Sequence, residues 1–290
     1  MSEPLVTVGL SFYNCEKTLL DAIKSIFAQT FQDWELILLD GGSSDRSLDV
    51  AKTINDPRVR VIGDGSYHTH PAALNRIIDL ARGKYIANMD GDDLCSPTRL
   101  EKQLELFKRD ESIDVVGTGL IYLGESDIPL GYTIPPVSHS EICKEPHRTF
   151  RIAHGSIMAK RSWHINNKYD ESAVKAEDFN LWLRSYEHSK FANVPEPLYY
   201  YRCETSSTFK KRFRCRLTCT KFLFSHYYHK GYLLKAMYYA SLQIIKFIIG
   251  NFICLFLSKR KYIERRYTPI SSEDKIRYAD ELDKIKKYVS

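Results

Sequence analysis

Acidic residues follow an apolar, strand-like run near residue 90. The run Tyr85 to Met89 continues directly into Asp90-Gly91-Asp92-Asp93. Carboxylate oxygens are the ligands that Mg²⁺ prefers, and a divalent cation held by one or two carboxylates commonly bridges the oxygens of a bound phosphate. An Asp-x-Asp triplet alone is also common in surface loops and helix caps. The surrounding sequence must therefore decide whether this one binds a cation.

Polar residues also follow two other strand-like runs. Ser11 to Asn14 ends the run that starts at Leu5, and Asp40 to Asp45 follows the run Trp34 to Leu39. In mostly parallel sheets, ligands bind beyond the carboxyl ends of the strands. We therefore expect these two segments and Asp90–Asp93 to line one shared cleft.

The elements that would position these segments alternate between strand and helix. Helical spacing of apolar residues covers residues 19–27, 48–54, 72–81 and 97–107, and a short strand is expected at 59–62. Asn14 is placed to cap the first helix. This alternation predicts an α/β fold with a mostly parallel sheet and helices on both faces.

The alternation of strand and helix signals becomes less regular after Val115. Four prolines, at 129, 135, 136 and 146, predict a loop-rich stretch, followed by a helix over 177–186 and an extended segment over 198–202. Seven scattered cysteines without a Cys-x-x-Cys pair are typical of reduced thiols in a cytosolic protein. Residues 1–4 show no charged segment followed by an apolar stretch, so no signal peptide is expected.

Charge divides the chain into an acidic front and a basic tail. Residues 202–290 hold 20 Lys and Arg against 7 Asp and Glu, whereas residues 1–201 hold 22 against 29. Residues 236–257 are largely apolar, with Gln243, Lys246 and Asn251 as interruptions. Three interpretations stay open: a helix lying in the membrane interface, which the basic neighbours favour, a spanning helix, or packing against the catalytic domain or an oligomer partner.

Many short motifs occur in an order that matches a known family. They are Ser-Phe-Tyr-Asn (11–14), Gln-Thr-Phe (29–31), Trp-Glu-Leu-Ile (34–37), Asp-Gly-Gly-Ser-Ser-Asp (40–45), Ala-Leu-Asn (73–75), Ala-Arg-Gly-Lys-Tyr-Ile-Ala (81–87), Met-Asp-Gly-Asp-Asp (89–93), Arg-Leu-Glu (99–101), and Glu-Asp with Leu-Trp-Leu-Arg (177–184). Over roughly residues 4 to 205 the chain resembles the family 2 glycosyltransferases of the GT-A fold, which invert the configuration of the transferred sugar.

The resemblance implies roles for the matching residues. It makes Asp92 the principal metal ligand, with Asp90 as a second ligand or ribose contact, and it stacks Tyr13 on the nucleotide base. The residues implied in nucleotide-sugar binding are Ser11, Tyr13, Asn14, Asp40, Asn75, Asp90 and Arg202. From the sequence alone, Tyr13 could equally be a core residue and Asp40 a turn residue. Gly41 stands where many relatives carry a second acid, which leaves the choice of base open.

The catalytic base is also implied by the resemblance. Inverting transfer is a single displacement in which a carboxylate removes the proton of the attacking hydroxyl. Asp178, with Glu177 beside it, matches the family's base at the start of a helix. The alternative is a helix start that carries acids only because of its dipole. His154-Gly155-Ser156 resembles a segment near the acceptor site.

These observations together predict a metal-dependent glycosyltransferase with a GT-A catalytic domain over 1–208. Its nucleotide-binding half covers 1–110, its acceptor half covers 111–208, and a helical basic region follows over 209–290. The expected cofactor is Mn²⁺ or Mg²⁺, and UDP-sugars lead as donors. The expected acceptor is a saccharide on a polyprenyl diphosphate, in surface-polysaccharide synthesis. We expect a cytoplasmic enzyme, peripheral on the inner face of the cell membrane through its C-terminal region.

The main alternative is a non-catalytic nucleotide- or nucleic-acid-binding module. The interleaved basic and aromatic residues of 210–228 would suit a single strand, which is held by charge and stacking. Such a module has no use for carboxylates at both Asp90/Asp92 and Asp178. We therefore expect no nucleic-acid partner, and the sequence does not define an oligomeric state.

Overall fold

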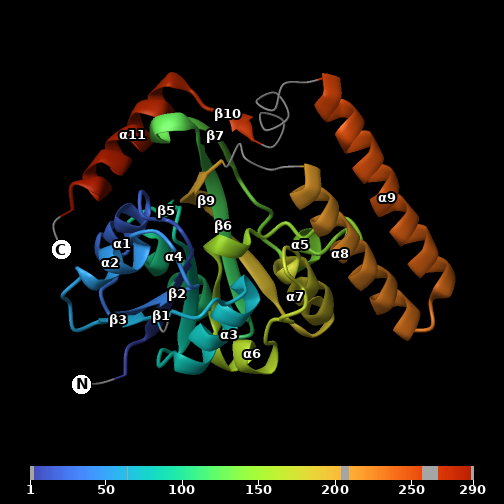
Figure 1. Ribbon diagram of the computed structural model, residues 1–290, viewed down its shortest axis with the longest axis horizontal. Coiled ribbons are helices and arrows are strands. Elements are labelled where there is room, and N and C mark those ends of the chain that lie inside the picture. The colour runs from blue at the N-terminus through green and yellow to red at the C-terminus, as the bar shows by residue number, and fades with distance from the viewer. Residues whose placement is uncertain (1–2, 64, 204–208, 257–266, 289–290) are drawn as a thin grey trace.

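The computed structural model describes residues 3–63, 65–203, 209–256 and 267–288, and these form one large twisted sheet surrounded by helices (Figure 1). The strands are β1 (Val6–Phe12), β2 (Trp34–Asp40), β3 (Val59–Ile62), β4 (Tyr85–Asp90), β5 (Leu94–Cys95), β6 (Val115–Leu123), β7 (Pro129–Thr133), β8 (Met158–Lys160), β9 (Phe191–Arg202) and β10 (Thr268–Pro269).

The N-terminal half of the sheet is parallel, in the order β4-β1-β2-β3. β1 is the central strand of this half, and its end lies beside the ends of both neighbours: Ser11 is opposite Asp90, and Phe12 is opposite Asp40. The four strands predicted from the sequence are confirmed. Parallel pairing therefore brings the three polar segments to one edge of the sheet, as predicted.

The prediction of a loop-rich stretch after Val115 is wrong in part. This stretch contains the nine-residue strand β6, which pairs with β7 and β8 in antiparallel and with β9 in parallel fashion. Most of β6 is buried, so it lacks the alternation of polar and apolar residues that marks a half-exposed strand. β5, directly after the acidic segment, pairs with β9 and ties that segment to the second half of the sheet.

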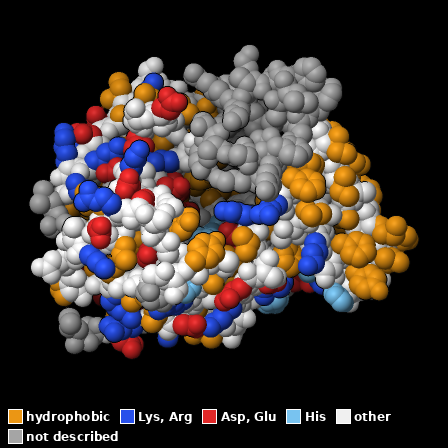
Figure 2. Space-filling view, viewed as in Figure 1, with side chains coloured by type: hydrophobic (Ala, Val, Ile, Leu, Met, Phe, Trp, Pro, Cys, Tyr) orange, Lys and Arg blue, Asp and Glu red, His pale blue; other side chains and the backbone are white. Residues whose placement is uncertain are grey.

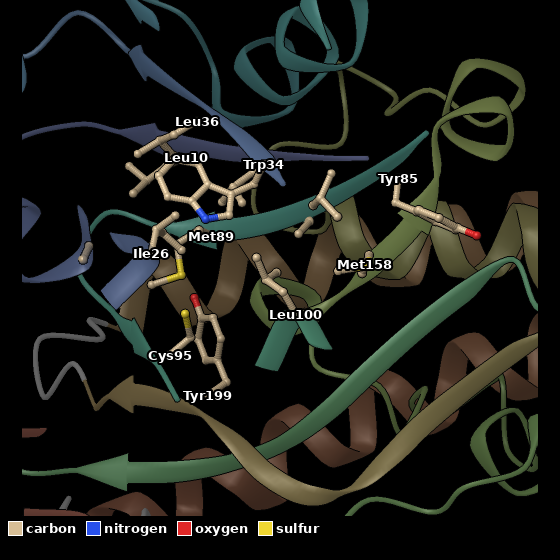
Figure 3. Packing of buried hydrophobic residues seen from close by; sticks show 14 of the residues in the cluster. Leu10, Ile26, Trp34, Leu36, Tyr85, Met89, Cys95, Leu100, Met158 and Tyr199 are labelled. Atoms are coloured by element: carbon tan, nitrogen blue, oxygen red, sulfur yellow. The ribbon is translucent and has the colours of Figure 1, made fainter. Parts of the chain in front are cut away.

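Helices cover both faces of the sheet. The helices are α1 (Leu19–Phe27), α2 (Ser47–Lys52), α3 (His70–Leu80), α4 (Arg99–Arg109), α5 (His139–Ile142), α6 (Arg161–Asn166), α7 (Glu177–Ser185), α8 (Phe209–His229), α9 (Leu233–Phe256) and α11 (Ser272–Lys286). The cluster between the sheet and α1 and α4 includes Ile26, Leu100 and Trp34 (Figure 3). A second cluster, with Leu74 and Trp182, lies between the sheet and α3, α6 and α7.

The C-terminal region divides into two parts that differ in their contacts. α8 and α9 form a helical hairpin beside α7 (Figure 1), where Leu223 is buried and Gln243 Nε2 donates to the backbone oxygen of His147 at 2.7 Å. α11 instead returns to the sheet domain beside α1. Within the described ranges, no helix combines the length and apolar character needed to cross a membrane.

One buried cation ties the sheet to α4. The side chain of Arg99 is fully buried and donates to the backbone oxygens of Asn88 at 2.8 Å and Ile157 at 3.2 Å, and to Gln103 Oε1 at 3.2 Å. These contacts hold β4 against the segment that leads into β8. Arg99 thus supports the strand that ends in Asp90.

We predict that Arg99→Met destabilises the protein by about 2–4 kcal/mol, because three buried acceptors lose their donor. Urea unfolding followed by circular dichroism measures the change. Arg109→Met is the matched control, since Arg109 ends the same helix with its side chain 73% exposed, and should change stability by less than about 0.5 kcal/mol. Equal unfolding midpoints for the two variants would contradict the role given to Arg99.

Candidate active site

A cleft of about 560 Å³ opens at the edge where β1, β2 and β4 end. It is lined by residues of all three predicted polar segments and by residues from the segments before α3 and α7. The lining residues include Ser11, Tyr13, Gly41, Tyr67, His70, Asp90, Asp92, Lys175, Glu177 and Tyr201. The shared cleft predicted from the sequence is therefore present.

The three aspartates of the acidic segment have different surroundings. Asp92 is exposed, Asp90 is half-buried, and Asp93 is fully buried. Tyr199 Oη lies 3.3 Å from Asp90 Oδ2 and accepts from the backbone N–H of Asp90 at 3.2 Å. Burial, with the charges of Asp92 and Asp90 as smaller causes, raises the pKa of Asp93 well above its usual value. Negative charge is concentrated at this end of β4.

The donor set of this segment fits a divalent cation that is shared with a phosphate ligand. Among the described residues, no group of three or more His, Cys, Asp or Glu side chains is arranged to hold a metal by itself. Asp90 and Asp92 both line the cleft and offer carboxylate oxygens, the preferred ligands of Mg²⁺ and acceptable ligands of Mn²⁺. A bound diphosphate would supply the remaining oxygens.

The opposite wall of the cleft is aromatic. The side chain of Tyr13 is 52% exposed, and its ring meets that of Tyr67 edge to face at a centroid distance of 5.9 Å. Tyr13 is therefore a surface residue rather than a core residue. Asp40 is buried, and its Oδ1 accepts from the backbone N–H of Ser43 at 3.0 Å, as expected for a turn aspartate. A Cβ at Gly41 would lie 3.2 Å from the backbone oxygen of Phe12, so a larger residue would be crowded.

Two of the predicted nucleotide-binding residues make structural contacts. Asn14, with φ 52°, accepts from the backbone N–H of Ser44 at 2.8 Å and joins the loops after β1 and β2. The prediction that Asn14 caps α1 is wrong, because Thr18 is the residue before the first helical turn. Asn75 donates to the backbone oxygen of Tyr169 at 3.0 Å and accepts from its N–H at 2.9 Å, which fixes the segment before α7.

Ser11 and His70 meet at the floor of the cleft. Ser11 Oγ lies 3.2 Å from His70 Nδ1, and His70 lines both the cleft and a neighbouring pocket. Neither His70 nor Lys175 was predicted from the sequence to line the cleft. A His-Pro pair at the start of the predicted third helix could have indicated His70, because helix starts after strand ends face the ligand side of such sheets. Lys175, with φ 69°, carried no comparable signal.

The neighbouring pocket of about 350 Å³ contains Asp178. It shares His70, Asp90, Lys175, Glu177 and Tyr201 with the cleft, and Asp178 and His154 line only this second pocket. Asp178 is exposed, on the first turn of α7, and its Oδ1 accepts from the backbone N–H of Phe179 at 2.6 Å. Glu177 Oε2 is buried without a hydrogen-bond partner among the described residues. The two pockets therefore meet at a wall of acidic groups.

His154 forms the back of the second pocket. Its Nε2 lies 2.8 Å from Tyr169 Oη. Burial lowers the pKa of His154, while the charges of Asp178 and Asp90 act in the opposite direction. Behind it, His164 is fully buried, neither of its ring nitrogens has a hydrogen-bond partner in the described part of the chain, and burial lowers its pKa to about 3. Both rings are therefore neutral at pH 7.

Arg202 lies at the rim of the acidic segment, on the last residue of β9. Its Nη1 donates to the backbone oxygen of Asp92 at 2.9 Å, and its Nε and Nη2 donate to the carboxylate of Asp127 at 2.6 and 2.7 Å. With its further bond to Asp21 Oδ2 at 2.9 Å, the guanidinium thus contacts three other residues of the protein in this structure. Contact of Arg202 with a diphosphate remains a prediction, as do the roles given to the other site residues.

Comparison with known sequences finds one matching family. The sequence model of glycosyl transferase family 2 matches residues 7–165. The chain is 36% identical over 218 residues to EpsE of Bacillus subtilis, which is described as a glycosyltransferase. That match covers 73% of this chain and 77% of EpsE.

Solved glycosyltransferases share the fold at low sequence identity. S. aureus TarS in complex with UDP matches at a TM-score of 0.60 with 14% identity, over 80% of this chain and 70% of that one. The mannosyltransferase PcManGT of Pyrobaculum calidifontis, in complex with GDP-Man and Mn²⁺, matches at a TM-score of 0.60 with 14% identity, over 90% of this chain and 84% of that one. The predicted GT-A fold is confirmed.

We predict that the protein loses stability as the pH falls below about 6.5. The unfolded chain takes up a proton on His164 near pH 6.5, whereas the folded chain resists it to about pH 3. Stability from this residue is complete above pH 6.5 and falls toward pH 3, by about 1.5 kcal/mol between pH 6.5 and 5. Denaturant unfolding at both pH values measures the loss.

His164→Leu should reduce this pH dependence by the same amount, because the titrating group is gone. His188→Leu, at an exposed position in the short 3-10 turn after α7, should retain the loss seen in the unmodified protein. If His164→Leu and the unmodified protein lose stability equally between pH 6.5 and 5, the buried neutral state assigned to His164 is wrong.

Proposed function

The chain belongs to glycosyltransferase family 2, and from this premise we propose that it transfers a sugar from a UDP-sugar to a membrane-bound saccharide acceptor with inversion at the anomeric carbon. The observation that carries this proposal is the shared wall of the two pockets. Asp90 lines both, Asp92 lines only the first, and Asp178 lines only the second. A donor in the first pocket and an acceptor in the second would meet at that wall.

Asp178 is the proposed base. Its exposed carboxylate on the first turn of α7 can accept a proton from an acceptor hydroxyl in the second pocket. The oxygen of that hydroxyl forms a bond to the anomeric carbon while the bond from this carbon to the diphosphate oxygen breaks. The nucleoside diphosphate leaves with the electron pair, and attack from the opposite face inverts the configuration.

Asp92 and Asp90 would hold the divalent cation, Mn²⁺ or Mg²⁺. A cation bound there stabilises the charge on the departing diphosphate. The buried Asp93 accepts from the backbone N–H of Arg202 at 2.8 Å, so it shapes the segment rather than facing the cleft with its full charge. The exposed Asp92 is the carboxylate best placed to be reached by a diphosphate from solvent.

The donor base would lie on the aromatic side of the cleft. The exposed ring of Tyr13 would offer a stacking surface for this base, and Tyr67 borders it. Support for UDP comes from TarS, whose structure contains UDP, whereas PcManGT contains GDP-Man. Both uridine and guanosine nucleotides must therefore be tested as donors.

A panel of UDP, GDP, dTDP and CDP, each with and without Mn²⁺, tests the site by thermal shift. We expect UDP with Mn²⁺ to raise the melting temperature, because a ligand of the native state adds about 2.7 kcal/mol at 100 times its Kd. Asp92→Asn should lose the Mn²⁺-dependent part of the shift. Asp178→Asn should keep the shift but lower turnover of the matching UDP-sugar by about 10²–10⁴-fold.

Two outcomes would contradict the proposal at different points. A shift in Asp92→Asn equal to that of the unmodified protein would move the cation elsewhere. Normal turnover in Asp178→Asn would remove Asp178 as the base while leaving the donor site intact. A rise in melting temperature with GDP but not with UDP would leave the proposed mechanism unchanged and make a GDP-sugar the donor.

The outer face of the helical hairpin is the proposed membrane contact. Hydrophobic side chains gather over α9 (Figure 2). The exposed members, here called the α9 patch, are Leu234, Met237, Tyr238, Ile244, Ile245, Ile248 and Ile249. Residues 209–256 contain nine Lys and Arg and no Asp or Glu. An apolar face whose charged neighbours are all Lys or Arg is typical of a helix that lies on an anionic bilayer.

The hairpin lies beside α7, which carries the proposed base. A membrane bound at the α9 patch would therefore lie on the same side of the protein as α7, separated from it by α8. This arrangement supports the predicted polyprenyl-diphosphate-linked saccharide as acceptor, since such a molecule presents its sugar at the bilayer surface. It would also place the enzyme peripherally on the inner face of the cell membrane.

Sedimentation with phosphatidylglycerol vesicles tests the membrane contact. The protein should sediment with these vesicles and much less with phosphatidylcholine vesicles. The double variant Ile245→Glu and Ile248→Glu should lower the bound fraction at least about 10-fold, because two charges enter the patch. Ile276→Glu is the control: Ile276 lies on α11 and is 63% exposed, similar to Ile248 at 61%, and its variant should bind as before.

If the unmodified protein stays in the supernatant, the membrane proposal fails. Light scattering without lipid then tests whether a second copy of the chain covers the α9 patch instead. A dimer that the double variant converts to a monomer would assign the α9 patch to a second copy of the chain.

A further inference from the structure

A network of partly buried ion pairs connects the acidic segment to the C-terminal helix α11. Arg202 is its centre: the backbone N–H binds Asp93, Nη1 binds the backbone oxygen of Asp92, and Nη2 binds Asp21 Oδ2 at 2.9 Å. The fork formed by Nε and Nη2 binds both oxygens of Asp127. The side chains of Arg202 and Asp127 are each only 15% exposed. One side chain therefore joins the segment after β4 to α1 and to the turn before β7.

Lys286, on the last turn of α11, completes the network. Its ammonium binds the same carboxylate of Asp127 and lies 4.0 Å from Asp21 Oδ2. Its backbone oxygen accepts from Lys24 Nζ at 2.7 Å. Two carboxylates are thus balanced by two cations, and one of these cations comes from the far end of the chain. Neither carboxylate would be fully compensated by Arg202 alone.

A second, apolar contact reaches the same place. Leu94, the residue directly after Asp93, is fully buried in a cluster with Tyr278, Leu282 and Ile285 of α11. Tyr200 belongs to this cluster, and its hydroxyl donates to Glu281 Oε1 at 2.8 Å. α11 therefore covers β5 and ends beside Asp127.

The turn that presents Asp127 has an unfavourable backbone. Ser126 and Asp127 have φ angles of 55° and 58°, a region that costs residues other than glycine about 1 kcal/mol or more each. The ion pairs of Asp127 with Arg202 and Lys286 offset this cost. They also hold the pKa of Asp127 low, at about 2, against the effect of its burial.

We propose that Arg202 and Lys286 are positioning residues, and that α11 braces the Asp90–Asp93 segment for cation binding. The carboxylates of Asp90 and Asp92 are close in sequence and repel each other, and Asp93 is buried beside them, so the segment needs an external support to keep Asp90 and Asp92 on one side of the loop. Arg202 supplies that support directly, and Lys286 fixes the carboxylate that orients Arg202. The link to cation binding rests on the proposed function, whereas the brace itself does not.

Hydrogen–deuterium exchange tests the brace without any ligand. Lys286→Met in the full chain should accelerate exchange of the Asp93 and Arg202 amides about 10-fold, because the network loses a cation and the segment opens more often. Amides of β1 and β2 serve as the internal reference for global opening. Lys287→Met is the matched control: its ammonium is the next one along the chain, 74% exposed and paired only with Asp283 of the same helix among the ion pairs described.

Asp127→Asn removes the carboxylate charge that pairs with Arg202 and Lys286, and it should accelerate exchange at Asp93 and Arg202 in the same way. The proposal is overturned if exchange at Asp93 and Arg202 is unchanged in Lys286→Met, or if it changes equally in Lys287→Met. Acceleration of the β1 and β2 amides by the same factor also overturns it, since α11 would then contribute only global stability.

The consequence for the cation is measured separately. We expect Lys286→Met to raise the Mn²⁺ concentration for half-maximal thermal stabilisation by UDP or GDP about 10-fold, and Lys286→Arg to restore it. Lys287→Met should match the unmodified protein. An unchanged Mn²⁺ requirement despite faster local exchange would overturn the link between α11 and the cation. If neither nucleotide stabilises the unmodified protein, the proposed donor site fails, and the exchange experiment still decides the brace.

Discussion

The site depends on one electrostatic constraint: three aspartates stand within four residues at the end of β4. Parallel pairing with β1 places this segment beside the loops after β1 and β2, and burial of Asp93 raises the cost of the shared charge. A buried or half-buried carboxylate needs a compensating partner. The surrounding cations and hydrogen-bond donors are arranged around this need, which a bound divalent cation would also meet.

Compensation comes from residues that are distant in sequence. Arg99 donates to the backbone oxygen of Asn88 in β4, and Tyr199 contacts Asp90. Arg202 contacts the backbone oxygen of Asp92 and, through its own backbone N–H, the carboxylate of Asp93. Arg202 is itself balanced by Asp127 and Asp21. β9 provides both Tyr199 and Arg202, so this one strand connects the donor side of the fold with its acceptor side.

The two parts of the C-terminal region have different relations to the site. The hairpin α8–α9 packs with one face against the domain and leaves the α9 patch exposed, whereas α11 buries its apolar face on β5 and ends at Asp127. A single basic tail in the sequence therefore corresponds to two structural units. We propose that the first faces the membrane and that the second supports the acidic segment.

The sequence by itself determined the strands of the parallel half and the three polar segments of the cleft, because periodicity is a local property, and the resemblance carried by its short motifs implied the GT-A fold. It missed β6, whose burial removes the alternating pattern, and it assigned Asn14 to a helix cap that Thr18 occupies instead. Only the tertiary structure decided that Asp178 and Asp90 share a pocket, that Asn75 binds a neighbouring backbone, and that Arg202 meets Asp127 and α11. Those contacts join residues tens to hundreds of positions apart, and no local pattern encodes which of them meet.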